Sequence, residues 1–410
     1  MSSGKSTPIV ISKPKTFDSE YDCLDGKLPC EEDWESSDLL ETDEQVGALE
    51  VEVVNEIEDP DLVPGEHLPL HAPFGKVGLL DFEILKLVGV GAYGRVFQVK
   101  EHSSGRIFAM KVIRKQDVVQ KNLIRHTKEE RNVLVAVEHP FIVTLRYAFQ
   151  TEHKLYLIMD FVPGGELFNR LNEENNFLEC DAKFYAAEIV LVFEHLHSMG
   201  VLYRDLKPEN ILVQRDGHLV LTDFGFAKRS HETTAKTFCG TLAYMAPEMV
   251  KLDGPYGKAV DWYSLGVLIF EMITGNTPFR APNRKDLQSK ILAGKYTIPK
   301  FVSLPAANII KKLLNKRVEK RLGSGPTGAA EVKKHSFFAG IDWTKLLKKQ
   351  LKPPFIPHIA AEDDTRFFEQ RFTSQEVLFT PPDREPAPLS SSLQEKFRGF
   401  SFVREDFHET

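Results

Sequence analysis

The sequence predicts an α+β protein of two lobes, a small lobe rich in strands followed by a larger, mainly helical lobe. Three successive runs combine β-branched and aromatic residues, which is typical of strands in an antiparallel sheet. These runs are residues 82–88, 95–99 and 107–113. Beyond a Pro-Gly-Gly turn at 163–165, residues 184–196 and 260–273 are apolar on most of their surface, as expected of buried helices.

The small lobe is expected to span residues 79–160 and to contain one helix, over 122–137, and a further strand over 155–159. The larger lobe should span residues 161–338. The remaining residues, 339–410, are rich in proline and phenylalanine, so we expect this tail to wrap around a surface rather than build a core of its own.

The N-terminal arm, residues 1–78, is acidic. Residues 1–75 hold 19 acidic and 4 basic side chains, a balance of −15, whereas the whole chain carries −7. Low periodicity and high charge predict that the arm is largely disordered. The rest of the chain is therefore mildly basic, which suits phosphate-bearing ligands but is too weak a signal to predict direct binding of nucleic acid.

The four cysteines, Cys23, Cys30, Cys180 and Cys239, show neither a metal-binding spacing nor a disulfide framework. No apolar run reaches the roughly 18 residues that a membrane span needs, and the N-terminus has no apolar signal core. We therefore expect a monomeric protein of the cytoplasm, or of the cytoplasm and nucleus.

A glycine-rich segment lies between the first two predicted strands. It reads Gly89-Val-Gly91-Ala-Tyr-Gly94-Arg-Val96. Glycines allow the backbone to approach phosphate groups without obstruction by side chains. Because the segment joins two strands instead of preceding a helix, a dinucleotide-binding fold is disfavoured.

Lys111 lies seventeen residues after Gly94, on a strand of otherwise apolar residues. Glu130 lies on the apolar face of the predicted helix, together with Leu134 and Val137. A carboxylate on such a face is costly without a partner. We expect Lys111 to be that partner, and the pair to direct the lysine toward the phosphates of a nucleotide.

A second constellation follows in residues 203–210, Tyr-Arg-Asp-Leu-Lys-Pro-Glu-Asn, with Asp-Phe-Gly at 223–225. Asp205 is suited to orient or accept the proton of a hydroxyl, and Lys207 to neutralise charge on a transferred phosphoryl group. Asn210 and Asp223 are oxygen donors of the kind that Mg²⁺ prefers. The sequence therefore predicts phosphoryl transfer from ATP to a hydroxyl.

These motifs together resemble the eukaryotic protein kinases over residues 82–338, and more narrowly the AGC group and its ribosomal S6 kinase branches. The narrower resemblance rests on Ala109-Met-Lys111, Gly164-Gly165-Glu166-Leu-Phe, Thr237-Phe-Cys-Gly-Thr and the tail motif Phe397-Arg-Gly-Phe400-Ser401-Phe402. It implies a two-lobed protein kinase fold with an AGC C-terminal tail, and an ATP- and Mg²⁺-dependent serine/threonine kinase. Lysine two places after the catalytic aspartate is typical of kinases that act on serine and threonine.

The resemblance also implies binding residues. Those expected around the nucleotide are Val88, Gly89, Gly91, Gly94, Val96, Lys111, Glu130, Met159, Asp160, Val162 and Glu166, with the adenine bonded to the backbone at Asp160 and Val162. Glu166, Glu209 and Glu271 are expected to bind arginine or lysine upstream of the target residue. A protein of the small ribosomal subunit is the substrate that the resemblance favours.

Three phosphorylation sites are implied as well: Thr237, Thr380 and Ser401. A phosphate on Thr237, from a phosphoinositide-dependent kinase, would pair with Arg204 and Lys228 and order the surrounding loop. Phosphorylated Ser401 and its aromatic neighbours would dock on the small lobe, while Phe355 and Phe368 wrap back toward the nucleotide.

Two alternatives stay open at this point. The chain could be the N-terminal kinase portion of a relative that carries two kinase domains, because the motif around Ser401 resembles theirs equally well. It could also be a catalytically silent scaffold with a kinase fold. Glu248 is expected to pair with Arg321, and Asp261 to brace the loop that carries Asp205.

Overall fold

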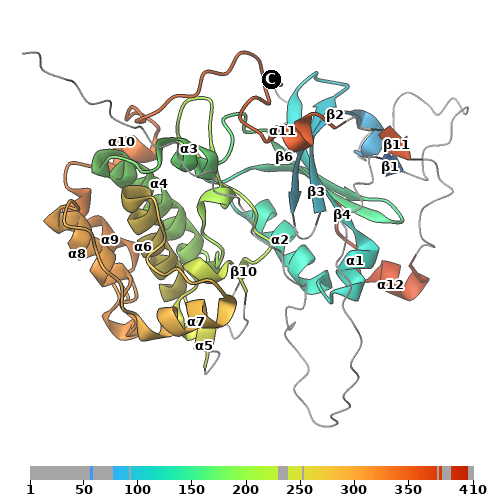
Figure 1. Ribbon diagram of the computed structural model, residues 1–410. Coiled ribbons are helices and arrows are strands. Elements are labelled where there is room, and N and C mark those ends of the chain that lie inside the picture. Colours follow the sequence, from blue (N-terminus) through green and yellow to red (C-terminus); the bar gives the residue numbers. More distant parts are fainter. Residues whose placement is uncertain are drawn as a thin grey trace, which may run out of the picture.

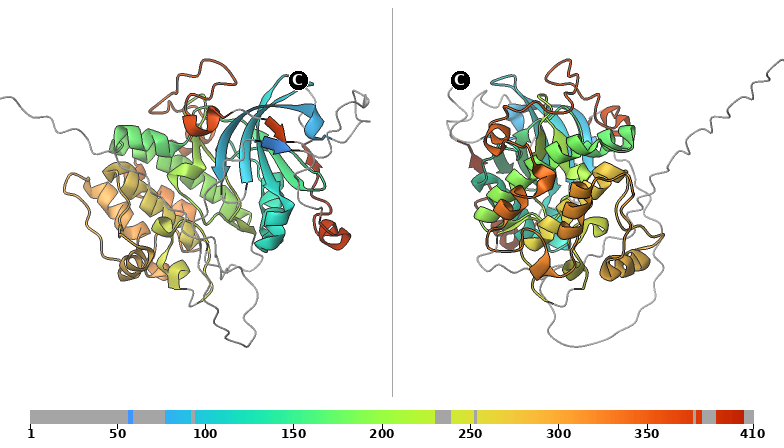
Figure 2. Two further views of the ribbon diagram at one scale, coloured as in Figure 1. Left: turned by 45° about the vertical axis from the view of Figure 1, so that its right-hand side comes forward. Right: turned by 90° about the vertical axis from the view of Figure 1, so that its left-hand side faces the viewer.

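A lobe of strands and a lobe of helices lie side by side, and the C-terminal segment runs along the outside of both (Figure 1, Figure 2). The computed structural model describes residues 56–58, 77–91, 94–229, 239–251, 254–375, 378–380 and 389–404. The α+β, two-lobed architecture expected from the sequence is confirmed. Among the described residues, no helix combines the length and apolar character that a membrane crossing requires.

The small lobe is built on an antiparallel sheet with the strand order β12-β5-β6-β4-β3-β2. The strands are β2 (Phe82–Gly91), β3 (Gly94–Glu101), β4 (Ile107–Arg114), β5 (Leu145–Gln150), β6 (Lys154–Asp160) and β12 (Phe402–Val403). The four strands predicted from the sequence are present, whereas β5 and β12 were not predicted. One face of the sheet buries an aromatic cluster in which Phe149 stacks on Tyr156, with ring centroids 4.7 Å apart.

Two helices cover the other face of this sheet, α1 (Lys115–Gln120) and α2 (Ile124–Ala136). The predicted helix over 122–137 corresponds to α2, while α1 was not predicted. Val133 and Leu134 of α2 are 1% exposed and belong to the same core as Leu157 of β6. This packing fixes the helix, and with it Glu130, against the sheet.

The large lobe is organised around α4 (Glu179–Ser198) and α6 (Ala259–Thr274), which are buried on nearly all sides, as their apolar sequences predict. The other helices of this lobe are α3 (Leu167–Glu174), α5 (Pro247–Lys251), α7 (Arg284–Ala293), α8 (Leu304–Leu313), α9 (Ala329–Lys333) and α10 (Trp343–Leu347). Short strands β7 (Val201–Leu202), β8 (Ile211–Val213), β9 (Leu219–Leu221) and β10 (Lys228–Arg229) frame the junction with the small lobe. Cys180 and Cys239 are free thiols.

The tail leaves α10, passes along the lobe junction to α11 (Gln370–Thr373), and continues through β11 (Leu378–Thr380) to α12 (Ser391–Glu395) beside α1 (Figure 1). It therefore wraps both lobes, as its sequence predicts. Part of the arm differs from expectation, because β1 (Glu56–Glu58) pairs in parallel with β11, with Glu58 opposite Thr380. These residues are ordered by backbone hydrogen bonding to the tail, which composition does not reveal. The rest of residues 1–76 lies outside the described part of the chain.

Arg321 and Glu248 form the buried pair expected from the sequence. The Arg321 side chain is fully buried, and its two terminal nitrogens lie 2.5 and 2.9 Å from the two carboxylate oxygens of Glu248. The same guanidinium donates to the carbonyl oxygens of Ala259 and Asn315, both at 2.9 Å. This pair thus ties α5 to the start of α6 and to the loop after α8.

We predict that Arg321→Ala destabilises the large lobe by about 3–5 kcal/mol, because it leaves a largely buried carboxylate and two carbonyl groups without their partner. Urea unfolding followed by far-UV circular dichroism measures this loss. Arg317→Ala, at an exposed arginine of the same loop, is the matched control and should change stability by less than about 0.5 kcal/mol. Equal losses in the two variants would contradict the assignment.

Candidate active site

Three charged side chains from three elements converge where the lobes meet. Lys111 Nζ, on β4, lies 2.7 Å from Glu130 Oε1 of α2 and 3.0 Å from Asp223 Oδ1. Burial would lower the pKa of the lysine, but the two carboxylates outweigh it and hold that pKa above its usual range. Lys111 is therefore a permanent cation, held between the lobes, of the kind that binds phosphate oxygens.

The glycine-rich segment forms the hairpin between β2 and β3, with Gly91 paired to Gly94. Residues 92 and 93, at its tip, lie outside the described residues. Gly89 has open space where a Cβ would stand, whereas a Cβ on Gly94 would lie 2.3 Å from the carbonyl oxygen of Val112 on β4. Close packing of two strands therefore requires glycine at position 94, in addition to the phosphate role expected of it. Val88 and Val96 lie on the same hairpin.

Asp261 braces the loop that carries Asp205, as the sequence predicts. Its carboxylate accepts the backbone N–H of Tyr203 at 3.1 Å and of Arg204 at 2.8 Å, and lies 2.7 Å from His197 Nε2. These bonds hold Arg204 at φ +70°, a left-handed conformation that is unusual for a residue with a side chain. The strained backbone aims Asp205 into the junction of the lobes.

Asp205 itself is nearly buried and surrounded by donors. Asn210 Nδ2 donates to its Oδ2 at 2.8 Å, Lys207 Nζ lies 3.3 Å from the same oxygen, and the Thr241 backbone N–H donates to Oδ1 at 3.0 Å. The Thr241 hydroxyl lies 3.2 Å from Asp205 Oδ1 and 3.0 Å from Lys207 Nζ. Burial raises the pKa of Asp205 above its ordinary value, although Lys207 opposes the shift. An aliphatic hydroxyl therefore already fits between these two side chains.

Asn210 and Asp223 can contribute to a magnesium site. Asp223 Oδ1 accepts hydrogen bonds from Lys111 and from the Gly225 backbone N–H at 3.2 Å, and the Asp223 side chain is 42% exposed. Burial would raise the pKa of Asp223, but Lys111 outweighs it and the pKa lies below its usual range, so this ligand is ionised. Mg²⁺ takes one or two protein oxygens and completes its shell with water and phosphate, and this sparse donor set fits that habit.

The segment that links the lobes contains Met159, Asp160 and Val162. Arg146 clamps the Asp160 carboxylate with two hydrogen bonds of 2.7 and 2.8 Å, and the Asp160 backbone N–H donates to the carbonyl oxygen of Thr144 at 3.1 Å. A bonded adenine would therefore use the carbonyl oxygen at Asp160, because the amide is engaged. Val162 is nearly buried at the start of the turn that follows.

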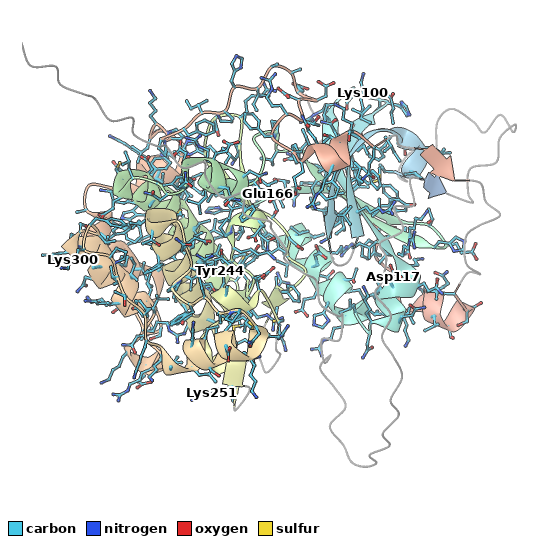
Figure 3. All side chains as sticks on the ribbon, in the orientation of Figure 1. Lys100, Asp117, Glu166, Tyr244, Lys251 and Lys300 are labelled. Atoms are coloured by element: carbon cyan, nitrogen blue, oxygen red, sulfur yellow. The ribbon has the colours of Figure 1, made fainter. Side chains whose placement is uncertain are left out.

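Three glutamates give the large lobe an acidic face next to this link. Burial, together with Glu209 and Glu369, raises the pKa of Glu166 to about 7. Burial also raises the pKa of Glu271 to about 7, although the Tyr244 hydroxyl donates to this carboxylate. Figure 3 places Glu166 at the lobe junction and Tyr244 within the helical lobe. Among the described residues, Glu209 Oε2 is buried with no hydrogen-bond partner. A cationic group bound at this face would supply that partner.

Comparison with known families agrees with this arrangement. The protein kinase domain model matches residues 82–338, and the protein kinase C terminal domain model matches residues 359–402. The chain belongs to the protein kinase family.

Individual relatives resemble this kinase over most of its length. It is 49% identical over 327 residues to ribosomal protein S6 kinase alpha-1 of Homo sapiens, which covers 78% of this chain and 44% of that protein. It is 43% identical over 373 residues to ribosomal protein S6 kinase alpha-2 of Mus musculus, covering 90% of this chain and 48% of the relative. The resemblance expected from the motifs is thus confirmed, and the chain spans about half the length of the curated relatives that it matches.

The end of the kinase tail docks on the small lobe. Phe397 and Phe400 are 0% and 1% exposed and belong to the large core. Phe402 pairs with Ala148 as β12 extends the sheet beyond β5. Ser401 is exposed. The aromatic cluster therefore occupies a groove on the small lobe, as the sequence resemblance implied, and the role of a phosphate on Ser401 stays a prediction.

Arg131 links this docked motif to the active site. Its Nε donates to the carbonyl oxygen of Phe400 at 3.0 Å, and its Nη2 to that of Ser401 at 2.9 Å. Arg131 follows Glu130 directly on α2, so the tail and Lys111 bind neighbouring residues of one helix. Sequence reasoning missed Arg131, since nothing in its own surroundings identifies a partner some 270 residues away.

Two of the expected phosphorylation sites cannot be placed by their side chains. Thr237 lies outside the described residues, and Thr380 is described only through its pairing in β11. Of its expected partners, Arg204 is buried and donates to Phe226 and Tyr256, while Lys228 lies on β10.

We predict that Arg131→Ala loosens the tail, because it removes two hydrogen bonds from a charged donor, each worth about 1.5–3 kcal/mol. Hydrogen–deuterium exchange should show protection across residues 397–403 falling by at least about tenfold. Arg125→Ala, at an exposed arginine on the same helix, serves as the control. A tail equally protected in both variants would show that Arg131 does not hold it.

Proposed function

We propose that this chain is an ATP- and Mg²⁺-dependent serine/threonine protein kinase of the ribosomal S6 kinase type. The single observation that carries the proposal is the convergence of Lys111, Asp205, Asn210 and Asp223 at the lobe junction, within a fold whose family transfers phosphoryl groups. The matched relatives are about twice as long as this chain. Its substrate, its upstream activators and its cellular location are therefore part of the proposal.

The chain's own residues suggest how transfer proceeds. Lys111, charged and fixed by two carboxylates, binds the α- and β-phosphates. Asp223 and Asn210 would hold Mg²⁺, which would neutralise phosphate charge when bound. Asp205 orients the hydroxyl of the acceptor and takes its proton as the new oxygen–phosphorus bond forms and the bond from the γ-phosphorus to ADP, the leaving group, breaks. Lys207 stabilises the charge on the transferred group. Thr241 already places an aliphatic hydroxyl against Asp205 and Lys207, so a serine or threonine fits there.

Basic sequences are the substrates that the acidic face favours. Glu166, Glu209 and Glu271 crowd carboxylates together, and their charge is best balanced by a guanidinium or ammonium group of a bound peptide. A ribosomal protein is a reasonable candidate substrate, because the relatives' names refer to ribosomal protein S6. The recognition is electrostatic, so it depends on the ionisation of these glutamates.

Phosphorylation is proposed to switch the activity at Thr237 and Ser401. A basic cavity beside α2 is lined in part by Arg125, His126, Lys128 and Arg229, the last residue of β10. A phosphate on Thr237 would find compensating charge there, which would fix α2 and thus Glu130. Ser401 contacts the same helix, α2, because its carbonyl oxygen accepts a hydrogen bond from Arg131.

The decisive experiment is transfer of radiolabelled phosphate from ATP to a serine peptide rich in arginine. Asp223→Ala should lower kcat by about a hundredfold to a thousandfold or more, because charge stabilisation in the transition state is lost. Asp363→Ala, which removes an exposed carboxylate of the tail, is the matched control. A Thr237-phosphorylated chain that binds ATP but never transfers phosphate would favour the silent-scaffold alternative.

We also predict a pH dependence of peptide recognition. Glu166 and Glu271 have pKa values of about 7, so they are mostly neutral below that pH and mostly ionised above it. KM for the arginine peptide should therefore fall by about tenfold between about pH 6 and pH 8 if one of them must be ionised. Initial rates across this range measure it, and a peptide with alanines in place of the arginines should show no such fall. Parallel profiles for the two peptides would contradict this mode of recognition.

A further inference from the structure

The tail segment 365–372 is fixed against both lobes at the active site. Lys86 Nζ, on β2, donates to Thr365 Oγ1 at 3.0 Å. Phe368 stacks on Phe161 of the lobe link, with ring centroids 5.4 Å apart and planes 19° from parallel. This stretch of the tail is thus held at the active site by specific side-chain contacts.

The same segment touches the turn before Glu166. Gly165 has φ +73°, and a Cβ at this position would lie 2.5 Å from the carbonyl oxygen of Phe367. The two backbones are in direct contact. Glu166 follows Gly165 and Glu369 comes two residues after Phe367, so the two carboxylates lie in one neighbourhood. Figure 1 shows α11 above the lobe junction, where Figure 3 labels Glu166.

Arg371 is the exposed cation of this neighbourhood. Its Nε lies 2.6 Å from Glu369 Oε2, and its guanidinium lies over the ring of Phe372, 4.7 Å from the centroid. Glu209 and Glu369 act on the ionisation of Glu166 as negative neighbours, and Lys207 and Arg371 as positive ones. Three carboxylates and one exposed arginine therefore share the surface on which a basic peptide would bind.

We propose that Glu369 is a substrate-binding residue that joins Glu166 in receiving the peptide's arginine, and that Arg371 occupies this position until a peptide displaces it. The inference rests on the proposed kinase function and names a residue pair of the tail that tunes its specificity. Arg371 acts as an internal competitor, because its guanidinium offers Glu369 the same bidentate partner that the peptide brings.

Exposure makes the exchange feasible. The Arg371 side chain is 69% exposed and that of Glu369 is 45% exposed, so their ion pair is screened by water and weak. Lys207 cannot take the same part, because it is held at Asp205 and Thr241. The peptide's arginine replaces the exposed contact of Arg371 with Glu369 and meets the carboxylate of Glu166 as well.

The test compares two peptides on the whole 410-residue chain, a serine peptide with upstream arginines and the same peptide with alanines there. Arg371→Gln should lower KM and Kd for the arginine peptide by about twofold to fivefold, the range of an exposed ion pair. Glu369→Gln should raise both by a similar factor. The alanine peptide brings no guanidinium, so its constants should move by less than about twofold in either variant.

Arg366→Gln is the matched control, since Arg366 is a 49% exposed arginine of the same tail that pairs locally with Asp364. A second readout separates competition from mere support of the tail. Arg371→Gln should raise the pH at which KM for the arginine peptide falls, because Glu166 loses a positive neighbour, and Glu369→Gln should lower it. Arg371→Gln that behaves like the control, or affects both peptides alike, would overturn the proposal.

Failure of this inference can be told from failure of the kinase assignment. Peptide affinities from fluorescence anisotropy do not need phosphoryl transfer, so they test peptide binding on their own. A chain that phosphorylates the arginine peptide selectively, yet gives unchanged constants in Arg371→Gln, loses only the competitor role. A chain that transfers no phosphate to either peptide, but shows the affinity shifts, supports the binding role of Glu369 and Arg371 and contradicts the kinase activity.

Discussion

The ion pairs of Lys111 with Glu130 and Asp223 are the constraint on which the rest of the site depends. They join the sheet, α2 and the large lobe through one ammonium group. Because a buried carboxylate is costly without its partner, a shift of α2 away from the sheet would strand Glu130 and release Lys111. The position of one helix thus determines whether a phosphate-binding cation is in place.

The tail binds the next residue of that helix. Arg131, the residue after Glu130, holds the carbonyl groups of Phe400 and Ser401, while Phe397 and Phe400 lie in the core that α2 also helps to build. A segment that lies beyond the catalytic lobes in sequence is therefore part of their packing. Such a link gives a physical route from the tail to the nucleotide site. The tail binds Arg131 and Lys111 binds Glu130, so both influence the position of α2.

The site was predictable from the sequence where a charged residue interrupts an apolar pattern. Lys111 on its strand and Glu130 on its helix face both stand out in this way, and the structure brings them together. Strand β5 carried a visible signal too, the alternation of Leu145, Tyr147 and Phe149, which was overlooked. The docking of the tail could not be predicted, because its partners are far apart in the chain and ordinary in their local setting. Composition likewise gave no hint that part of the acidic arm is ordered against β11.

Strand β12 has a consequence for the protein's behaviour in solution. It caps β5, which would otherwise end the sheet with a row of unpaired amide and carbonyl groups. Edges of this kind recruit strands from other molecules. Detaching the tail would therefore expose the edge of β5 together with the groove that Phe397 and Phe400 fill. We expect both surfaces to promote self-association, which the docked tail prevents.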